Sequence, residues 1–407
     1  MESVSSLPMS AEPARWLPPS PFQPALSEQA EPAPAAAELL AGVDGAPRQG
    51  FLLLATPAWS GGLAALREAL GRELPSSALG AVIVDGLLAG GRERAGQRAA
   101  ALLPVAALGS SEEGGDPAAD LASGLPTPET GSGPGKGTGG QGGLALLFFD
   151  PIAADAERLA RRLWEQRPGL ALAGVGAAPG APLVGETGHP ATALAALLPA
   201  ATPRLEATRA CRRVTGFHRV TSARGHWVLR LDGRPALDVF RSAAAGRLAA
   251  DPRRAVRHLV AILPAAGGEQ VRELAGYCDR RRALCLGTPV ARGERIGFGL
   301  RDPATALGDL RALLERASGL RGPGPRPAGL YLTCRARDAA FFGLEDLEAA
   351  YLDRAFPDLA VLGIRGPSPI AALGAAPSRL PHAGVLALLG PARDAARGPV
   401  ECRQASG

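Results

Sequence analysis

Lysine is almost absent from this chain, and aromatic residues are few. Lys136 is the only lysine among 44 basic residues, and aromatic residues make up 4% of the sequence. Arginine-rich, alanine-rich usage of this kind is typical of a GC-rich bacterial genome. Codon usage therefore explains the high arginine content before any binding function does. The net charge of +5 is small for 407 residues, and the arginine clusters lack the interleaved aromatic residues of single-strand binders. The composition therefore argues against a nucleic-acid partner.

Paired cysteines and long hydrophobic runs are also missing. The five cysteines follow no CxxC spacing, which argues against a disulfide framework or a metal site and fits a reducing compartment. Residues 1–25 lack the basic start and apolar stretch of a signal peptide. The longest apolar runs, such as 144–149, fall far short of the roughly 20 residues that span a bilayer. We expect a cytoplasmic protein with no membrane insertion, no metal and no cofactor.

Two stretches have the composition of unfolded chain. Residues 1–46 are dominated by Pro, Ala, Ser and Glu, and residues 110–143 by Gly, Ser, Pro and acidic residues. Such segments bury too little apolar surface to offset their chain entropy. We expect a disordered tail and a disordered insert. Within the insert, 135–138 (GKGT) resembles a phosphate-binding loop, but Thr130 replaces the required first Gly and Gly137 follows Lys136 where Ser or Thr is needed.

Between these stretches, strand and helix patterns alternate. Continuous apolar runs predict buried strands, and apolar residues at helical spacing predict helices between them. The expected strands are 51–55, 81–84, 144–149, 170–175, 226–231, 329–334 and 385–389. The expected helices are 63–74, 156–164, 235–244, 302–314 and 344–355. The sequence predicts a mixed α/β fold with two lobes, each a mixed β-sheet with helices packed on it.

Eight segments, taken in order, resemble one family, the FIST proteins of sensory and intracellular signal transduction. The similar segments are 79–96, 146–164, 170–180, 210–221, 225–240, 295–315, 329–343 and 380–390. The most distinctive is LDGRPALDVF at 231–240. The resemblance implies a FIST_N-like domain over residues 47–205, which holds the insert 110–143, a FIST_C-like domain over 206–395, and a tail at 396–407.

What the resemblance implies is the sensing of a small ligand, with amino acids proposed as ligands, and signalling through a separate protein. The sequence departs from the family at two turns. Residues 335–338 (RARD) stand where an Asn-Gly-Arg-Gly-like turn is usual, and 366–370 (GPSPI) lack the acidic residue of a Gly-Glu-Ile-Gly-Pro-like loop. A ligand pocket that used this acidic residue would be altered.

Five side chains are the candidate ligand-binding residues. They lie in or beside predicted turns: Arg92, Glu93, Arg335, Arg337 and His382. The charged pair Arg92–Glu93 follows a glycine-rich turn, where it could receive an ammonium and a carboxylate. Arginines at a strand end can hold a carboxylate or phosphate with two hydrogen bonds. Each residue also has a purely structural interpretation, as a solvated turn, a surface charge or a core histidine.

Three functions remain open at this point. The first is a binding protein for a small polar metabolite that acts through an unknown signalling partner and is not an enzyme. The second is a protein-interaction scaffold that has kept the fold and lost the pocket. The third is a cysteine-dependent enzyme with Cys211 or Cys334 as nucleophile, although free cysteines more often pack as small apolar side chains.

Overall fold

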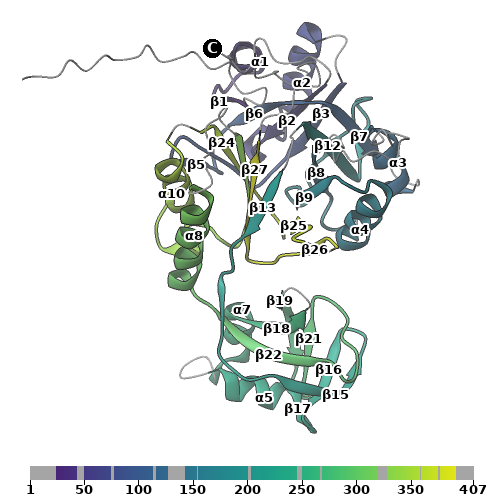
Figure 1. Cartoon of the computed structure of the whole chain (residues 1–407), viewed down its shortest axis with the longest axis vertical. Helices are drawn as coiled ribbons and strands as arrows, with labels where there is room; N and C mark the ends of the chain where they lie inside the picture. Colours follow the sequence, from purple (N-terminus) through teal and green to yellow (C-terminus); the bar gives the residue numbers. More distant parts are fainter. Residues whose placement is uncertain are drawn as a thin grey trace, which may run out of the picture.

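The computed structural model describes residues 24–43, 50–74, 78–112, 116–126, 143–153, 155–199, 203–244, 250–265, 268–318, 328–357, 359–374 and 376–390. It consists of a large body and a smaller domain joined to it by two chain crossings (Figure 1). The predicted mixed α/β class is confirmed. Across the described ranges, no helix has the length and apolar character needed to cross a membrane.

The body contains three six-stranded sheets with the same strand plan. In each sheet a central parallel pair is flanked on one side by two antiparallel strands and on the other by a short antiparallel hairpin. The first sheet runs β1(Ala25–Ser27), β6(Ala100–Val105), β2(Gly50–Ala55), β3(Ala78–Ile83), β10(Leu183–Val184), β11(Pro190–Ala191). The second runs β7(Ala107–Ser111), β12(Ala193–Pro199), β8(Gly143–Phe149), β9(Ala171–Gly176), β25(Ile370–Ala371), β26(Ser378–Arg379). The third runs β13(Arg204–Ala207), β27(Gly384–Leu389), β23(Ala328–Cys334), β24(Val361–Gly366), β4(Gly86–Ala89), β5(Arg92–Arg94).

Chain order repeats as well, so the body is built from three equivalent units. Each unit reads edge strand, helix, strand, helix, parallel strand, hairpin, return strand. Unit 1 covers residues 25–105, unit 2 covers 107–199, and unit 3 covers 204–389 with an insertion. The first helices are α1(Pro32–Gly42), α3(Pro117–Ser123) and α8(Pro303–Ser318). The second helices are α2(Leu63–Glu73), α4(Ala156–Gln166) and α10(Leu347–Ala355).

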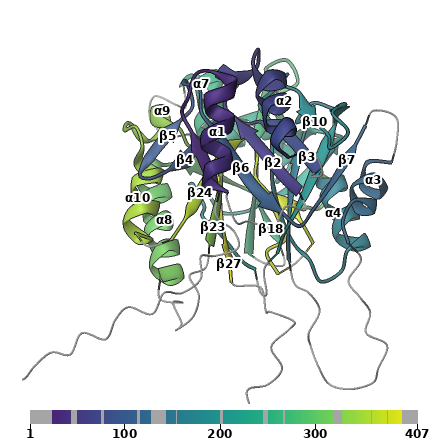
Figure 2. The same ribbon diagram turned by 90° about the horizontal axis from the view of Figure 1, so that it is seen from above.

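The hairpins are exchanged between units in a closed cycle. Hairpin β4–β5 of unit 1 extends the sheet of unit 3, hairpin β25–β26 of unit 3 extends that of unit 2, and hairpin β10–β11 of unit 2 extends that of unit 1. Each unit therefore completes its neighbour's sheet. Figure 2 shows the resulting arrangement, with the helix pairs α1–α2, α3–α4 and α8–α10 outside the strands.

Alternation along the strands separates an inner from an outer core. The inward side chains of all three sheets, for example Leu52, Leu146 and Leu330, form one central cluster. The outward side chains pack against the helix pair of their own unit in three further clusters. This two-sided burial explains why the central strands are continuous apolar runs.

The smaller domain is inserted in unit 3 between β13 and α8. It is an antiparallel sheet in the order β19(Gly268–Arg272), β18(Leu259–Ala265), β22(Arg295–Arg301), β15(His218–Arg224), β16(Trp227–Leu231), β21(Ala283–Leu286), β20(Leu274–Cys278). Strand β14(Cys211–Arg213) pairs with β22 and β17(Arg234–Pro235) with β16, and the helices are α5(Ala236–Ala243) and α7(Pro252–His258). A separate hydrophobic core around Phe240 and Phe298 holds it together.

Two short helices complete the described elements. They are the 3-10 helix η1(Pro57–Trp59) and α9(Ala339–Phe342). Asp338 caps α9, because its carboxylate accepts a hydrogen bond from the Phe341 amide at 2.9 Å. Asp302 lies just before α8, and its carboxylate accepts a hydrogen bond from the Thr305 amide at 3.0 Å.

Several boundary predictions differ from the structure. The tail prediction is wrong for β1 and α1, because Ala35, Ala36 and Leu39 are buried in the outer core of unit 1. The insert prediction is wrong for α3, whose Leu121 packs in the outer core of unit 2. The stretch after β3, expected as a glycine-rich turn, forms the β4–β5 hairpin. The loop 135–138 and the tail 396–407 lie outside the described residues.

The sequence predicted a domain boundary between residues 205 and 206, and the structure divides the chain elsewhere. Residues 303–389 belong to the body, since β24 pairs with β4 and β25 with β9. The part of the predicted second domain that folds apart from the body is the insertion at 211–301. Pairing between segments far apart in the chain produces this difference.

Candidate functional site

The carboxyl ends of the parallel strands converge at one end of the body. The Ala178 amide donates to the Ile83 carbonyl at 2.8 Å, and the Gly176 amide donates to the Pro367 carbonyl at 2.9 Å. Arg365 at the end of β24 pairs with Gly86 at the start of β4. Open α/β sheets bind ligands beyond the carboxyl ends of their strands, so this end is the first place to look for a site.

A buried polar network centred on Glu348 lies at this end of unit 3. The Glu348 carboxylate accepts hydrogen bonds from the Tyr331 hydroxyl and the Thr333 hydroxyl, both at 2.7 Å, and from Arg337 Nε at 2.8 Å. The side chains of Arg337 and Glu348 are almost completely buried. Gly384 of β27 leaves the room that Tyr331 needs, because a Cβ there would lie 2.0 Å from the Tyr331 hydroxyl oxygen.

A second ion pair extends the network toward the exchanged hairpin. Arg365 of β24 pairs with Glu93 of β5 and donates to the Arg337 carbonyl at 3.1 Å. The Glu93 amide in turn donates to the Asp346 carboxylate at 2.6 Å. The network therefore ties β23, β24, α10 and the hairpin from unit 1 into one assembly.

The equivalent positions of the other two units are apolar or glycine. Where unit 3 has Tyr331, Thr333, Glu348 and Arg365, unit 1 has Leu53, Ala55, Leu66 and Ile83, and unit 2 has Leu147, Phe149, Leu159 and Gly176. The spacing along the chain agrees with this alignment. Glu348 precedes Arg365 by the same number of positions as Leu66 precedes Ile83 and Leu159 precedes Gly176. Burying charges costs free energy even when they are paired. Since two units adopt the same strand plan without such a network, the plan by itself does not require one.

Burial and pairing fix the ionisation of this network. Burial alone would lower the pKa of Arg337, but the Glu348 carboxylate beside it holds that pKa above its ordinary value. Burial, together with the nearby Glu348 charge, raises the pKa of Tyr331 strongly. Burial also raises the pKa of Glu93, against the opposing effect of Arg365. The core of the network is thus a charged pair with a neutral tyrosine.

A less tightly held pair lies at the edge of the network. Arg335, directly after β23, places its Nε 3.4 Å from Oδ2 of Asp85, which lies in the short link between β3 and β4. The Arg335 side chain is 51% exposed and that of Asp85 14%, and Oδ2 has no hydrogen bond from any described residue. Burial raises the pKa of Asp85, while Arg335 and Arg365 oppose the shift. This pair combines a largely buried acid with a half-exposed base.

The five predicted site residues are distributed unevenly over this region. Glu93 and Arg337 belong to the network itself, and Arg335 belongs to the open pair beside it. His382 lies next to them, because its carbonyl accepts from Arg337 Nη1 at 3.3 Å. Arg92 is exposed on β5 and makes no side-chain contact with the network in the described structure.

His382 connects the network to the inserted domain. Its backbone is left-handed, with φ of 63°, and its Nε2 lies 3.9 Å from the Glu273 carboxylate of the inserted domain. Burial, with the positive charges of Arg301 and Arg337, lowers the pKa of His382 to about 3. Arg301 at the end of β22 adds a second contact, donating to the Ala336 carbonyl at 2.8 Å. The loop after β23 is therefore in contact with both parts of the molecule.

Sequence reasoning missed Glu348, Arg365 and Asp85. Two of them carried a usable signal. Arg365 interrupts the apolar run of β24, and Glu348 occupies a buried position on α10. A charge at a position that should face the core points to a buried partner.

The described residues offer no group of three His, Cys, Asp or Glu side chains arranged to hold a metal. Their four cysteines are free. Burial raises the pKa of Cys211 to about 12 and also raises that of Cys334. Both therefore remain thiols at neutral pH.

No family model matches the chain. Uncharacterized protein Rv0628c of Mycobacterium tuberculosis is 29% identical over 226 residues, which cover 52% of this chain and 58% of the relative. Uncharacterized protein Mb0898c of Mycobacterium bovis is 30% identical over 165 residues, which cover 38% and 42%. The chain thus spans little more than half the length of the first of these relatives. It resembles mycobacterial proteins whose names describe no activity.

Proposed function

We propose that the chain binds a small zwitterionic metabolite, such as an amino acid, between Asp85 and Arg335. The observation that carries this proposal is the Asp85–Arg335 pair at the converging strand ends, in which a half-exposed arginine meets a largely buried acid, resting on a buried network that the other units lack. Asp85 Oδ2 can accept hydrogen bonds from an ammonium group, and the exposed Arg335 guanidinium can turn to hold a carboxylate with two hydrogen bonds. One ligand with both groups would replace the loose internal pair.

The buried network supports this binding by keeping its two ends in place. Arg337 and Arg365 fix the chain immediately after β23 and at the end of β24, so the backbone carrying Arg335 does not have to be ordered when the ligand arrives. A preorganised site loses less entropy on binding. This is a reason for unit 3 to carry the cost of buried charges.

The occupied state would be communicated through the loop that follows β23. This loop holds Arg335 and also contacts the inserted domain through Arg301 and Ala336. A ligand that prefers one position of the inserted domain shifts the population toward it. The proposed output is recognition by a separate signalling protein, in the cytoplasm, as the resemblance to FIST proteins implies.

The second candidate, an interaction scaffold without a ligand, is favoured by the missing acidic residue in the GPSPI loop. The cysteine-dependent enzyme is the least supported of the three, because a thiol with a raised pKa supplies little thiolate for attack.

A thermal-shift screen against amino acids, small carboxylates, amines and nucleotides tests the proposal. A ligand that binds only the folded state, at about 100 times its Kd, adds roughly 2.7 kcal/mol of stability. We expect an amino acid to raise Tm, and Asp85→Asn and Arg335→Ala each to remove the rise. Arg354→Ala, at an exposed position on α10, is the matched control and should keep it. A flat screen with folded protein contradicts the proposal and favours the scaffold.

A further inference from the structure

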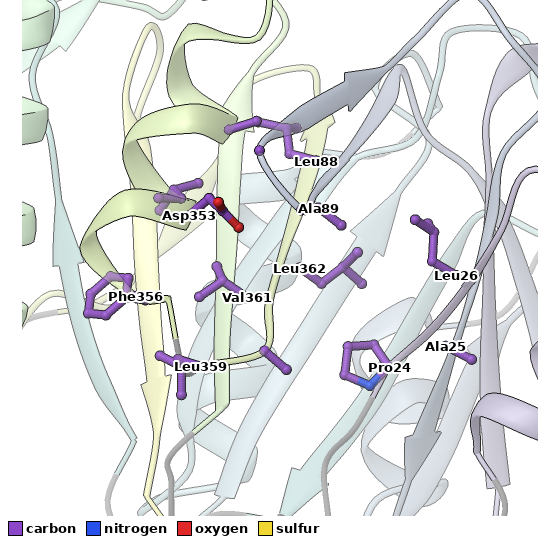
Figure 3. Close-up of a pocket in the computed structure, with 15 residues that line it drawn as sticks. Pro24, Ala25, Leu26, Leu88, Ala89, Asp353, Phe356, Leu359, Val361 and Leu362 are labelled. Atoms are coloured by element: carbon purple, nitrogen blue, oxygen red, sulfur yellow. The ribbon is translucent and has the colours of Figure 1, made fainter.

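A separate pocket lies at the seam between unit 1 and unit 3, away from the Asp85–Arg335 pair. It has a volume of about 230 Å³ and lies between β1, the exchanged β4–β5 hairpin, α10 and β24. Its walls are largely apolar, and include Leu26, Leu88, Ala349, Phe356 and Leu362. Among the described residues that line it, Asp353 is the one with a charge, and Figure 3 shows its carboxylate directed toward Ala89.

The threefold plan of the body provides two equivalent seams for comparison. At the seam between unit 1 and unit 2, Arg67 of α2 reaches the exchanged hairpin β10–β11. Its guanidinium donates to the carbonyls of Leu79 at 3.0 Å and Glu186 at 3.0 Å, and also to that of Gly185 at 3.3 Å. The aliphatic stem and cationic head of one protein side chain therefore occupy this seam.

The position of Arg67 differs in the other units. Arg67 directly follows Leu66, and the equivalent residues after Leu159 and Glu348 are Ala160 and Ala349. In unit 2 the next turn of the helix carries Trp164, which packs against the outer core of that unit. In unit 3 the same place on the next turn holds Asp353. Units 1 and 2 thus each have one large side chain at these two helix positions, whereas unit 3 has Ala349 and Asp353.

The charge at the pocket between units 1 and 3 is opposite in sign to the charge at the seam that Arg67 occupies. The hairpin carbonyls of Ala89 and Arg92 are already satisfied by Arg94, which pairs with Glu28. No ion pair joins Asp353 to a described residue, and the pocket has an anionic group where its sister seam has a cation. The ligand that complements it carries its own positive charge.

We propose that this pocket binds a small amphiphilic cation, with a short hydrocarbon body against the leucines and an amine or guanidinium group at Asp353. Arg67 is the internal precedent, since its own stem and guanidinium occupy the equivalent seam. The volume is below the roughly 300 Å³ at which drug-sized pockets begin, so the ligand is small. It is an alkylamine or alkylguanidine and not a peptide or a nucleotide.

Calorimetric titration with n-butylguanidinium, using n-butylurea as the uncharged isostere, tests this proposal on the full chain. We expect n-butylguanidinium to bind at about millimolar Kd, the strength that so few atoms can supply, and at least five times more tightly than n-butylurea. Asp353→Asn should remove this preference and leave the affinity for n-butylurea unchanged. Ala349→Arg, which supplies the cation present in unit 1, should abolish binding of both.

The matched control is Ala350→Arg, one position along α10 on its exposed side. It should bind n-butylguanidinium as the unchanged protein does. Equal affinity for the two probes, no binding of either, or unchanged binding in the Ala349→Arg variant overturns the proposal. So does binding that appears only after deletion of residues 1–23, because the pocket's occupant is then the chain itself. Should Ala349→Arg fail to fold, the Asp353→Asn comparison decides.

Discussion

At the scale of single residues, the pKa values of His382 and Asp85 are shifted by burial. These shifts make the stability of the folded protein depend on pH. His382 is buried beside arginines and lies at the contact with the inserted domain. Asp85 is largely buried at the strand ends, with 14% of its side chain exposed. Burial disfavours the charged form of each, so His382 resists gaining a proton and Asp85 resists losing one.

His382 should make the protein less stable in mild acid. Its folded pKa of about 3 lies below the ordinary value of 6.5, so the unfolded chain binds the proton first as the pH falls from about 6.5 toward 3. The loss is about 2 kcal/mol at pH 5. Urea unfolding at pH 7 and pH 5 measures it. His382→Asn, which tolerates the left-handed backbone, should show a pH dependence smaller by about that amount, and an unchanged dependence contradicts the prediction.

The ionised Asp85 carboxylate should reduce the stability of the protein at neutral pH, although the proposed ligand needs it for binding. Its folded pKa is raised, so any stabilising contribution is present at low pH and is lost as the pH rises through that pKa. We expect Asp85→Asn to increase the free energy of unfolding at pH 7 and to abolish the amino-acid response. Acidic pH provides the internal control, because the protein with protonated Asp85 and the Asp85→Asn variant should then be equally stable. A large loss of stability at pH 7 would mean that Asp85 is a structural residue.

At the scale of elements, the outer face of the third sheet is where the three units differ most. Its helix–sheet contact contains the charged network beside an apolar cluster, whereas the contacts in units 1 and 2 are apolar. Removing one member of a buried pair leaves the other charge without a partner, which is the costly case. Replacing all members with uncharged side chains removes the cost, and units 1 and 2 provide the template at the positions of Tyr331, Thr333, Glu348 and Arg365.

Glu348→Leu alone should therefore lower the free energy of unfolding by about 3 to 5 kcal/mol. The combined variant should return to within about 2 kcal/mol of the starting protein. Its substitutions are Tyr331→Leu, Thr333→Ala, Arg337→Leu, Glu348→Leu, Arg365→Ile and Glu93→Gln. Denaturant unfolding, analysed with a common m value, measures the stability of the single and the combined variant. The ligand response should be weakened in the combined variant. A combined variant as unstable as Glu348→Leu would show that unit 3 needs its charges to fold.

The sequence was informative wherever one element could be recognised alone. The strands at 51–55, 144–149 and 329–334 are continuous apolar runs, because both faces of each sheet are covered. Helix α4 combines helical spacing with a cap at Asp155. Helix α1 was missed because its Pro and Ala composition is typical of disordered chain, although Leu39 anchors it in the outer core.

Features that depend on distant pairing could not be predicted in this way. The exchanged hairpins contain strands of two to four residues, such as β10 and β25, which are too short for a periodic pattern. Their partners lie in another unit. For the same reason the Arg365–Glu93 pair joins residues that no local motif connects, and the candidate residues emphasised turns and missed the buried Glu348.

At the scale of the whole molecule, the insertion is a domain with its own core within a threefold body. Units 1 and 2 pass from their edge strand to their first helix without a domain between them. In unit 3 the two ends of the insertion are adjacent, because the Asp302 amide donates to the Ala210 carbonyl at 3.1 Å. Neither the inner core nor the helix-packed outer cores use residues of the insertion.

Deleting residues 211–301 and joining Ala210 to Asp302 through a short glycine linker should therefore leave a folded body. We expect a single cooperative unfolding transition by circular dichroism, and residues 211–301 expressed alone should also fold around Phe240 and Phe298. Because the deletion exposes His382 and the loop after β23, the pKa of His382 should rise toward its ordinary value, which NMR titration of the imidazole measures. The linker placed instead between Asp232 and Gly233 of the intact chain is a control for the added glycines. A body that fails to fold would show that the insertion is part of the folding unit, and the two parts could then not act as the separately moving sensor and reporter proposed above.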